Sequence, residues 1–342
     1  MKVISVTNQK GGCGKTTTAV NLAAGLSRKG FNTLLIDLDP QHHATMHLGY
    51  LESKHSILNI FDDLLKDIEF SPSDYITERS GKFRIISSEM DLGALEPELA
   101  HNNYALELLS RLIDKIQGLN FDYTIIDCPP SLGFLTLNAL KCSDAVIIPL
   151  KCSIFSLNGA KNSKRILNIL GDYSDKLPAV FYMVNMFDKR SNFTKQFLID
   201  LQKQLKPNMF STVIRNNVHI PESAQKGKTV FEHNPKSRGA FDFTALTEEF
   251  LNKMASVTPM EFKAYAPQAN KVYLVGDFNK WQRENEYAMV RRNGNWKKII
   301  YLNKGRYRYK FVVDEQWTHD NSNPNKESDS FGGYNSLIET SS

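Results

Sequence analysis

The sequence predicts an α/β domain with a mostly parallel sheet and helices on both faces, followed by a small all-β domain. The first domain is indicated by an apolar, strand-like start at Val3 to Val6, a glycine-rich turn, and a run from Thr17 to Arg28 whose apolar residues recur at helical spacing. The second is indicated by short alternating strands with closely spaced turn residues after Pro259. With 342 residues, the chain can bury a core in each domain. We place the domains at 1–252 and 260–342, joined by a short linker at 253–259.

The turn between the first strand and the first helix has the composition of a phosphate-binding loop. Glycines let the backbone approach an anion closely, and the N–H groups at a helix start attract negative charge. Lys15 can place its ammonium on the β- and γ-phosphates, and the Thr16 hydroxyl can ligate Mg²⁺. A merely flexible glycine turn would not require this Lys-Thr pair. The residues predicted to bind nucleotide here are Gly11, Gly12, Cys13, Gly14, Lys15, Thr16 and Thr17.

The loop departs from the ordinary P-loop pattern in an informative way. Gln9 stands where that pattern has its first glycine, and a second lysine, Lys10, lies five residues before Lys15. The arrangement resembles the deviant Walker A motif of the ParA/MinD family of partitioning and positioning ATPases. The resemblance covers residues 1 to about 252 and implies a P-loop NTPase fold that uses ATP and Mg²⁺. It also implies an ATP-dependent homodimer in which Lys10 reaches the partner's nucleotide; without the resemblance, Lys10 would be an ordinary solvated charge.

Two further apolar runs end in carboxylates, where an ATPase needs them. Asp37 and Asp39 follow one run and Asp127 ends the other. The carboxyl ends of parallel strands face the crevice in which open α/β sheets bind ligands, so Asp127 is predicted to hold Mg²⁺ through water. In the family's switch segment, the residue matching Asp39 orients the attacking water. A strand-end Asp also commonly caps a helix or forms a turn, and for Asp37 this alternative stays open. The predicted catalytic residues are Lys10, Lys15 and Asp39.

Two later segments, 184–188 and 217–223, lie where the family holds adenine. Asn185 is the preferred contact because its amide can both donate to and accept from a base edge. Pro221 and Glu222 are further candidates, although a proline near a strand end is equally explained by structure alone.

Composition favours a cytoplasmic protein. Hydrophobic residues make up 41% of the chain, and no apolar run is long enough to span a bilayer. The N-terminus runs directly into a strand, so we expect no signal peptide. Four cysteines without C-x-x-C spacing argue against disulfides, a zinc site or an iron–sulfur cluster. A membrane-binding C-terminal helix, as in MinD, is not expected because another domain occupies that end.

The charge pattern leaves DNA binding open. The formal net charge is +5, which is mild for a nucleic-acid-binding protein. Many ParA-type proteins bind DNA non-specifically as ATP-bound dimers, and the resemblance extends this expectation to the nucleoid. A strip of basic residues could contact phosphates or could simply be solvated: Lys226, Lys228, Lys236 and Arg238.

The second domain predicts a β-sandwich of about 80 residues. Its expected strands are 262–266, 271–275, 296–302 and 306–313. The runs Val275-Gly-Asp-Phe-Asn-Lys-Trp281, Gly305 to Asp314, Gln316 to Asp320 and Phe331-Gly-Gly-Tyr-Asn-Ser336 resemble the glycogen-binding module of the AMP-activated kinase β subunit. The resemblance implies an immunoglobulin-like sandwich that binds an α-glucan.

Sugar binding has simple physical requirements. The CH face of a glucose ring packs on an aromatic plane, and its hydroxyl rim needs hydrogen-bonding groups. An exposed tryptophan could instead be a protein contact. The positions that match the sugar-contacting residues of the module are Trp281, Lys310, Trp317, Phe331 and Asn335.

Together the two halves predict an ATP-dependent switch that positions or segregates a carbohydrate-rich cargo such as glycogen granules. Dimerisation would present two glucan sites at once and raise avidity. The family implies a separate protein that stimulates hydrolysis. Two alternatives stay open: a glucan-sensing regulatory ATPase without transport, and a chromosome- or plasmid-partitioning ATPase whose β domain is a protein-interaction module. A carbohydrate-processing enzyme is not favoured, because the small domain shows no paired-carboxylate constellation.

Overall fold

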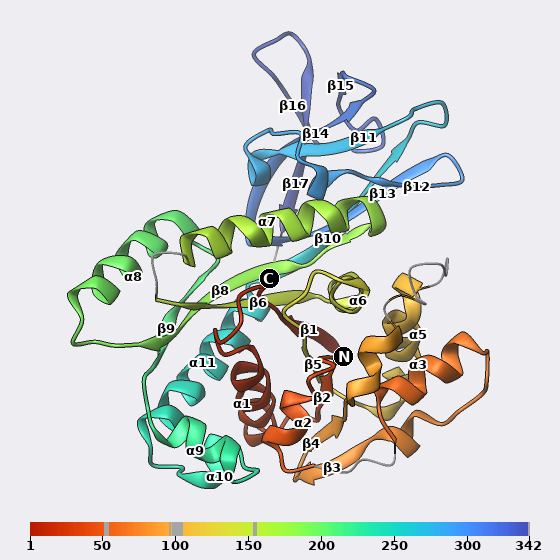
Figure 1. The fold of residues 1–342 in the computed structure, drawn as a ribbon. Coiled ribbons are helices and arrows are strands. Elements are labelled where there is room, and N and C mark those ends of the chain that lie inside the picture. The colour runs from red at the N-terminus through yellow and green to blue at the C-terminus, as the bar shows by residue number, and fades with distance from the viewer. Residues whose placement is uncertain (51–54, 96, 98–104, 153–155, 341–342) are drawn as a thin grey trace. The chain divides into compact units, whose positions relative to one another are not determined.

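The computed structural model describes residues 1–342 except 51–54, 96, 98–104, 153–155 and 341–342 (Figure 1). The chain forms two compact units, one of residues 1–163 and 180–250, the other of residues 164–179 and 251–342. Among the described helices, none combines the length and the apolar character needed to cross a membrane.

The first unit is built on an eight-stranded sheet in the order β3-β4-β2-β5-β1-β6-β8-β9. The strands β4, β2, β5, β1 and β6 pair in parallel, as do β8 and β9, while β3 is antiparallel to β4. Their bounds are β1 Lys2–Val6, β2 Thr33–Asp37, β3 Thr77–Ser80, β4 Phe83–Ile86, β5 Tyr123–Asp127, β6 Ala145–Lys151, β8 Ala179–Phe187 and β9 Met209–Arg215. The predicted mostly parallel α/β fold is confirmed.

Helices cover both faces of this sheet (Figure 1). Leu34, Ile36 and Ile126 belong to one buried cluster with α3, α5 and α6. Neighbouring residues of a strand point to opposite faces, so Leu35 and Ile125 face the other side, where α1 contacts β2 and β5. Both central strands are buried along nearly their whole length, as expected for a parallel sheet covered on two sides.

The helices have the following bounds. They are α1 Lys15–Arg28, α2 His43–His47, α3 Ile57–Leu65, α5 Leu108–Ile116, α6 Phe134–Cys142, α7 Ser156–Tyr173, α8 Asn192–Leu205, α9 His219–Gln225, α10 Val230–His233 and α11 Arg238–Ala255. Short 3-10 turns lie at Pro72–Tyr75, Met90–Ala94, Ala105–Glu107, Gln117–Leu119, Asp277–Asn279 and Asn285–Tyr287.

The second unit contains two mainly antiparallel sheets. One has the order β10-β13-β12 with β7 added to β13, and the other has the order β11-β14-β17-β16 with β15 paired to β14. The strands are β7 Lys176–Leu177, β10 Val257–Tyr265, β11 Val272–Gly276, β12 Val290–Arg292, β13 Asn295–Asn303, β14 Gly305–Val313, β15 Gln316–Thr318, β16 Lys326–Ser328 and β17 Tyr334–Thr340. The rings of Phe262 on β10 and Tyr309 on β14 meet edge to face, 4.9 Å apart at their centroids. The predicted small β-sandwich is confirmed, and all four expected strands are present.

The stretch predicted as a linker contains regular structure. Helix α11 ends at Ala255 and β10 begins at Val257, so Ser256 alone separates them. The second unit also includes 164–179, a stretch far away in the sequence. There, β7 pairs in parallel with Ile299 and Ile300 of β13. The domain bounds of 1–252 and 260–342 stay a prediction.

A fully buried lysine lies where β13 meets 164–179. Lys298 is 0% exposed, and its Nζ donates to the Ser174 carbonyl at 3.1 Å. Burial lowers the pKa of Lys298 to about 8, although the carboxylates of Asp175, Glu286 and Asp172 oppose this shift. The folded unit therefore prefers the neutral amine more strongly than the unfolded chain does.

This burial predicts a pH-dependent stability. Between pH 8 and 10.5 the unfolded chain binds more protons at Lys298 than the folded unit, so Lys298 makes stability rise with pH in that window and lowers it below. In Lys298→Met this contribution is removed. We expect the difference in unfolding free energy between wild type and variant to change by up to about 3 kcal/mol across the window.

Urea unfolding followed by tryptophan fluorescence measures this directly, because Trp281, Trp296 and Trp317 are the three tryptophans of the chain and all lie in the second unit. Lys271→Met, at an exposed lysine of the same unit, is the matched control and should show a constant difference. A constant difference for Lys298→Met as well would contradict the shifted pKa.

Candidate functional site

The glycine turn between β1 and α1 is open at one end and tightly packed at the other. Gly12 and Gly14 both have left-handed backbone angles, with φ of 66° and 89°. A Cβ atom added to Gly11 or Gly12 would have no neighbour within 4 Å, whereas one at Gly14 would lie 2.0 Å from Asn185 Nδ2. Gly14 is therefore required by both conformation and space, while Gly11 and Gly12 leave room in which an anion fits.

Asn185 supports this loop. Its side chain is 3% exposed, Nδ2 donates to the Cys13 carbonyl at 3.2 Å, and Oδ1 accepts from the Met186 N–H at 2.8 Å. Both halves of the amide are engaged by backbone, so Asn185 joins β8 to the P-loop. The predicted contact of Asn185 with adenine stays a prediction.

Asn8 is a residue that the sequence analysis missed. Its Nδ2 donates to the Pro149 carbonyl at 2.7 Å, and its Oδ1 accepts from the Lys10 N–H at 3.0 Å. The buried amide thus ties the turn that carries Lys10 to the end of β6. An Asn two residues before a turn is a common turn-forming pattern, and this was the signal available.

Two carboxylates meet at the carboxyl ends of neighbouring strands. Asp37 of β2 is the register partner of Asp127 of β5. Asp127 is fully buried, and neither of its oxygens has a hydrogen-bond partner among the described residues. Burial raises the pKa of Asp127 well above its usual range, and the Asp37 carboxylate raises it further. The nearby side-chain hydroxyl of Thr16 lowers this pKa in part. A buried carboxylate with unpaired oxygens is suited to a hydrated cation, so Thr16 and Asp127 fit the predicted Mg²⁺.

Asp37 and Asp39 have different surroundings. Asp37 Oδ2 accepts from the Thr45 N–H at 2.8 Å and from its hydroxyl at 2.7 Å, and Oδ1 accepts from the Asp39 N–H at 3.2 Å. Asp37 thus holds the turn into α2, which is the structural role left open for it, and burial raises its pKa to about 6. Asp39 is 4% exposed and accepts from the Gln41 N–H at 3.0 Å. Lys15, which is 8% exposed, begins α1.

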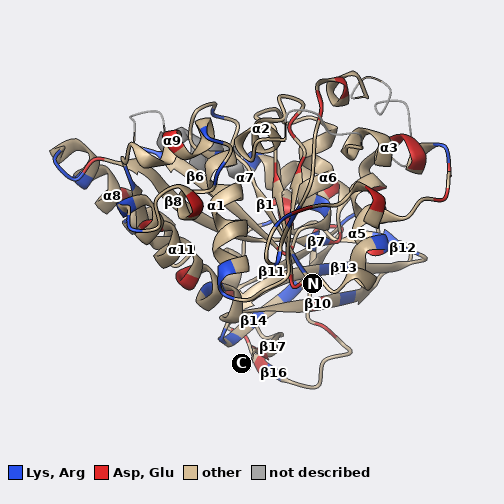
Figure 2. Ribbon diagram, turned by 90° about the horizontal axis from the view of Figure 1, so that it is seen from below, with Lys and Arg blue, Asp and Glu red and all other residues tan. Residues whose placement is uncertain are grey.

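The remaining predicted nucleotide contacts lie on α9. Pro221 is in its first turn, and the Glu222 carboxylate is held by His219 and His233. Their contact with adenine stays a prediction. The basic strip around α9 and the start of α11 (Lys226, Lys228, Lys236 and Arg238) is exposed. Figure 2 shows basic and acidic segments interspersed along the chain.

The second unit carries a groove of about 780 Å³ that contains all five predicted sugar contacts. Its lining consists of Trp281, Arg308, Lys310, Trp317, Ser328, Asp329, Ser330, Phe331 and Asn335. The rings of Trp281 and Trp317 lie 6.4 Å apart at their centroids with 32° between their planes. Trp317 is 48% exposed and Phe331 is 93% exposed. The groove thus offers solvent-facing aromatic planes beside polar groups.

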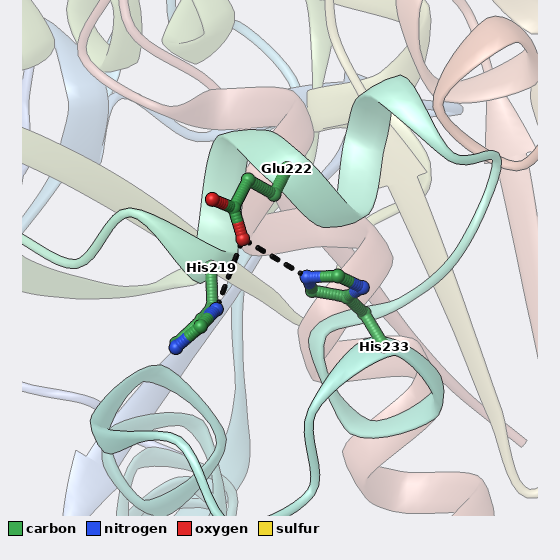
Figure 3. A group of neighbouring side chains, drawn as sticks. All are labelled: His219, Glu222 and His233. Atoms are coloured by element: carbon green, nitrogen blue, oxygen red, sulfur yellow. Dashed lines mark hydrogen bonds and ion pairs between the residues drawn. The ribbon is translucent and has the colours of Figure 1, made fainter.

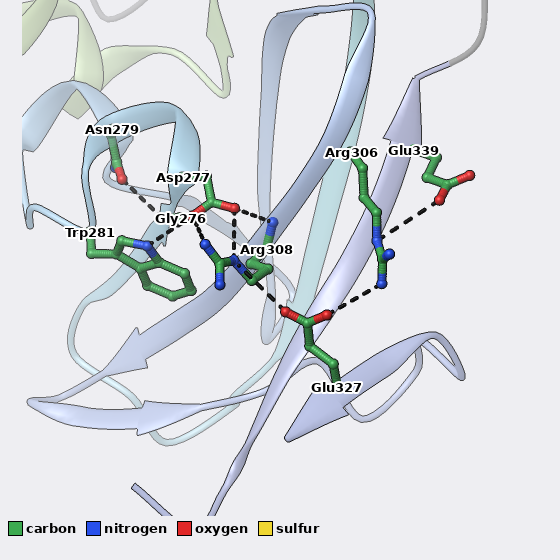
Figure 4. Close-up of polar contacts among 8 residues, drawn as sticks. All are labelled: Gly276, Asp277, Asn279, Trp281, Arg306, Arg308, Glu327 and Glu339. Atoms are coloured by element: carbon green, nitrogen blue, oxygen red, sulfur yellow. Dashed lines mark hydrogen bonds and ion pairs between the residues drawn. The ribbon is translucent and has the colours of Figure 1, made fainter. Parts of the chain in front are cut away.

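Asp277 and Arg308 orient the indole ring of Trp281 (Figure 4). Trp281 has a left-handed φ of 62°, and its Nε1 donates to Asp277 Oδ1 at 3.1 Å. The same carboxylate accepts from the Arg308 backbone N–H at 2.8 Å and from its Nε at 3.1 Å. Asp277 lies within the Val275–Trp281 run, but its partner on β14 is not visible in the sequence.

Asp329 orients the loop that carries Phe331. One carboxylate oxygen accepts from the N–H groups of Phe331 and Gly333, each at 2.8 Å, and the other pairs with the Lys310 ammonium. This pairing with Lys310 lowers the pKa of Asp329 to about 2. Lys310 therefore anchors the loop, and its direct contact with sugar stays a prediction. Asn335 is on β17, opposite Glu327 of β16.

Comparisons with known proteins match both halves of the chain. Residues 1–177 match the AAA domain family, and residues 258–342 match the family described as the glycogen recognition site of AMP-activated protein kinase. The sporulation initiation inhibitor protein Soj of Bacillus subtilis is 35% identical over 249 residues, which are 72% of this chain and 97% of Soj. The chromosome partitioning protein ParA of Myxococcus xanthus is 34% identical over 261 residues, which are 75% of this chain and 90% of that protein.

Solved structures of other proteins share the fold of the first part of the chain. Cobyrinic acid a,c-diamide synthase from Mycobacterium smegmatis, solved with an ATP analogue and magnesium, has a TM-score of 0.63 at 28% identity and covers 75% of this chain and 96% of its own. Apo McdA from Cyanothece has a TM-score of 0.64 at 21% identity over 73% of this chain and 99% of its own, which shows the shared fold.

The fold and the glycine loop thus define a P-loop protein of the AAA domain class. Within that class, the chain belongs to the ParA/Soj family, here joined to a glycogen-recognition domain. The resemblances stated from the sequence are confirmed.

Proposed function

We propose that this protein is an ATP-dependent dimerising switch of the ParA type that positions or segregates a cargo, and that its second unit binds an α-glucan such as glycogen. The observation that carries the proposal is the groove lined by Trp281, Trp317 and Phe331, on a chain that also has a phosphate-binding loop. The first unit would bind and hydrolyse ATP, and the second unit would recognise the cargo.

On the nucleotide side, the residues fit ATP with Mg²⁺. The backbone of 11–17 would surround the phosphates, and Thr16 and Asp127 would hold the ion, which would neutralise charge on the phosphates. Lys15, which is 8% exposed at the start of α1, would place its ammonium on the phosphates. Asp39 would orient the attacking water, and Lys10 would reach the nucleotide of a second copy. The ATP-analogue and magnesium complex of a structural neighbour supports this assignment.

On the glucan side, the tilted pair of Trp281 and Trp317 suits the CH faces of sugar units in a curved chain. The Asp277 contact holds the Trp281 ring, and Asp329 holds the backbone of the loop that carries Phe331, before any sugar arrives, which would lower the entropic cost of binding. A dimer would present two such grooves to one polymer and gain avidity from effective concentration.

Co-sedimentation of the full chain with glycogen, with and without ATP, tests this proposal. Wild type should sediment in both states and bind more tightly with ATP. Lys10→Ala should keep the nucleotide-free binding and lose the increase with ATP, because the dimer would no longer form. Absence of sedimentation in both states would refute glucan binding by the second unit.

A second candidate function is partitioning on DNA with the sandwich as a protein-interaction module. It is favoured by the exposed basic strip of 226–238 and by the partitioning proteins among the relatives. It predicts salt-sensitive DNA binding without glucan affinity. A glucan-sensing ATPase without transport would instead show glucan-stimulated turnover and no DNA affinity.

A further inference from the structure

We propose that His219, Glu222 and His233 form a binding site for a divalent transition-metal ion of borderline softness, with Zn²⁺ as its natural representative. His219 Nδ1 lies 3.0 Å from Glu222 Oε2, and His233 Nε2 lies 3.1 Å from the same oxygen. All three donor atoms lie within 4.8 Å of one another. Figure 3 shows both imidazoles directed at the carboxylate.

The local sequence places these groups together. His219 and Glu222 are three residues apart on α9, so they project from the same side of the helix. Residues 226–229 then turn the chain into α10, which ends at His233. The two imidazole rings come to 5.7 Å between centroids.

The distances from Glu222 to the two imidazoles are close to those between ligands of one metal ion. Zinc–nitrogen and zinc–oxygen bonds are about 2.0–2.2 Å long, so two ligands at a tetrahedral angle are separated by about 3.3–3.5 Å. The two contacts to Glu222 would have to open by only a few tenths of an ångström to admit an ion. Two imidazoles and one carboxylate are also a known three-ligand zinc set that leaves a fourth position open.

The cluster of His219, Glu222 and His233 is partly exposed to solvent. The side chains of His219 and Glu222 are 36% and 44% exposed, while that of His233 is 11% exposed. An ion can enter from the exposed side, and a water molecule or a ligand from another molecule can take the fourth position.

The surroundings of His219 supply a second observation. Asn234 Nδ2 lies 3.3 Å from His219 Nε2, the ring nitrogen that faces away from Glu222. An imidazole that ligates through Nδ1 carries its proton on Nε2 and needs an acceptor there. A flip of the Asn234 amide brings its oxygen to this position, because the two ends of an amide differ little in shape. Asn234 could thus accept a hydrogen bond from Nε2 of a metal-bound His219.

The alternative is a purely hydrogen-bonded cluster. Each neutral imidazole can donate one N–H to the Glu222 carboxylate, and no ion is then required. The cysteine spacing, which argues against a zinc site, bears only on cysteine ligands and not on this set. Two of the three ligands, His219 and Glu222, lie in the segment 217–223 that is predicted to contact adenine. We therefore expect an ion at the site to change the affinity for ATP, and this readout alone rests on the proposed function.

The test is zinc titration of the full chain after removal of bound metal by a chelator, without ATP or Mg²⁺. Wild type should bind one Zn²⁺ per chain. His233→Gln and Glu222→Gln should each weaken binding by at least about tenfold. Glu222→Gln keeps an oxygen that accepts from both imidazoles, so it separates loss of the ligand charge from loss of the fold. His55→Gln, at an exposed histidine elsewhere in the first unit, should bind as wild type does.

Co²⁺ substitution identifies the ligands. Absorption in the visible range without thiolate charge-transfer bands supports the His-Glu set, whereas such bands would assign the ion to a cysteine and overturn the proposal. Lack of saturable Zn²⁺ binding in wild type, or equal affinity in wild type and both variants, would leave the hydrogen-bonded cluster as the correct description. None of these readouts depends on ATP turnover or glucan binding, so their failure is distinct from failure of the proposed function.

Discussion

Replacing Trp281 and Trp317 together by alanine should abolish sedimentation with glycogen in the presence and absence of ATP. Buried contacts of tryptophan at binding interfaces are worth about 2 kcal/mol or more each, so the double variant should bind about a thousandfold more weakly if the two effects add. The rings lie 6.4 Å apart in one groove, and Trp317 is 48% exposed, so their loss should remove the stacking surface and leave the core intact.

The matched control for this experiment is Trp296→Phe. Trp296 is 5% exposed in the sandwich core, and its Nε1 donates to the Ala266 carbonyl at 2.9 Å. This variant should lose stability but keep its affinity for glycogen. A double variant at Trp281 and Trp317 that still sediments like wild type would show that the groove is not the glucan site.

The second large effect is expected at Asp39. In Asp39→Ala, ATP should still bind, because the phosphate loop and Thr16 are untouched, but phosphate release should fall by about 10²–10³. The physical reason is the loss of the carboxylate that would position the attacking water. Calorimetric ATP binding and phosphate release separate the two steps.

Asp37→Asn provides the contrast, two residues away. Asp37 accepts from the Thr45 N–H and hydroxyl and so holds the turn into α2. Its replacement should lower the unfolding temperature, since a buried hydrogen-bond network is disturbed. If Asp39→Ala turned over ATP at the wild-type rate, Asp39 would not be the water-positioning residue.

Much of this molecule is encoded locally. The strand, turn and helix around Lys15, and the carboxylates that follow two apolar strands, lie within short stretches whose periodicity and turn residues indicate their structure. The sugar-binding candidates could also be predicted from the sequence, because short runs around Trp281, Trp317 and Phe331 resemble a known module. Local patterns of this kind indicate element type and residue chemistry.

Contacts between segments that are distant in the sequence could not be predicted in this way. Asn185 packs on Gly14 across 171 residues, Arg308 of β14 holds Asp277 in the turn after β11, and Lys298 is buried against Ser174. Alternation within β13 identifies one face of the strand but not that 164–179 joins the same unit. Such pairings depend on which elements come together.

The sequence by itself therefore determined the two domain types, the phosphate loop and the chemical identity of the candidate site residues, because each depends on neighbours along the chain. Only the tertiary structure decided that five sugar-contact candidates share one groove and that Asp37 and Asp127 meet at adjacent strand ends. It also decided that His219, Glu222 and His233 converge. The physical reason is that these arrangements follow from strand pairing and helix packing, which bring together residues that no local pattern connects.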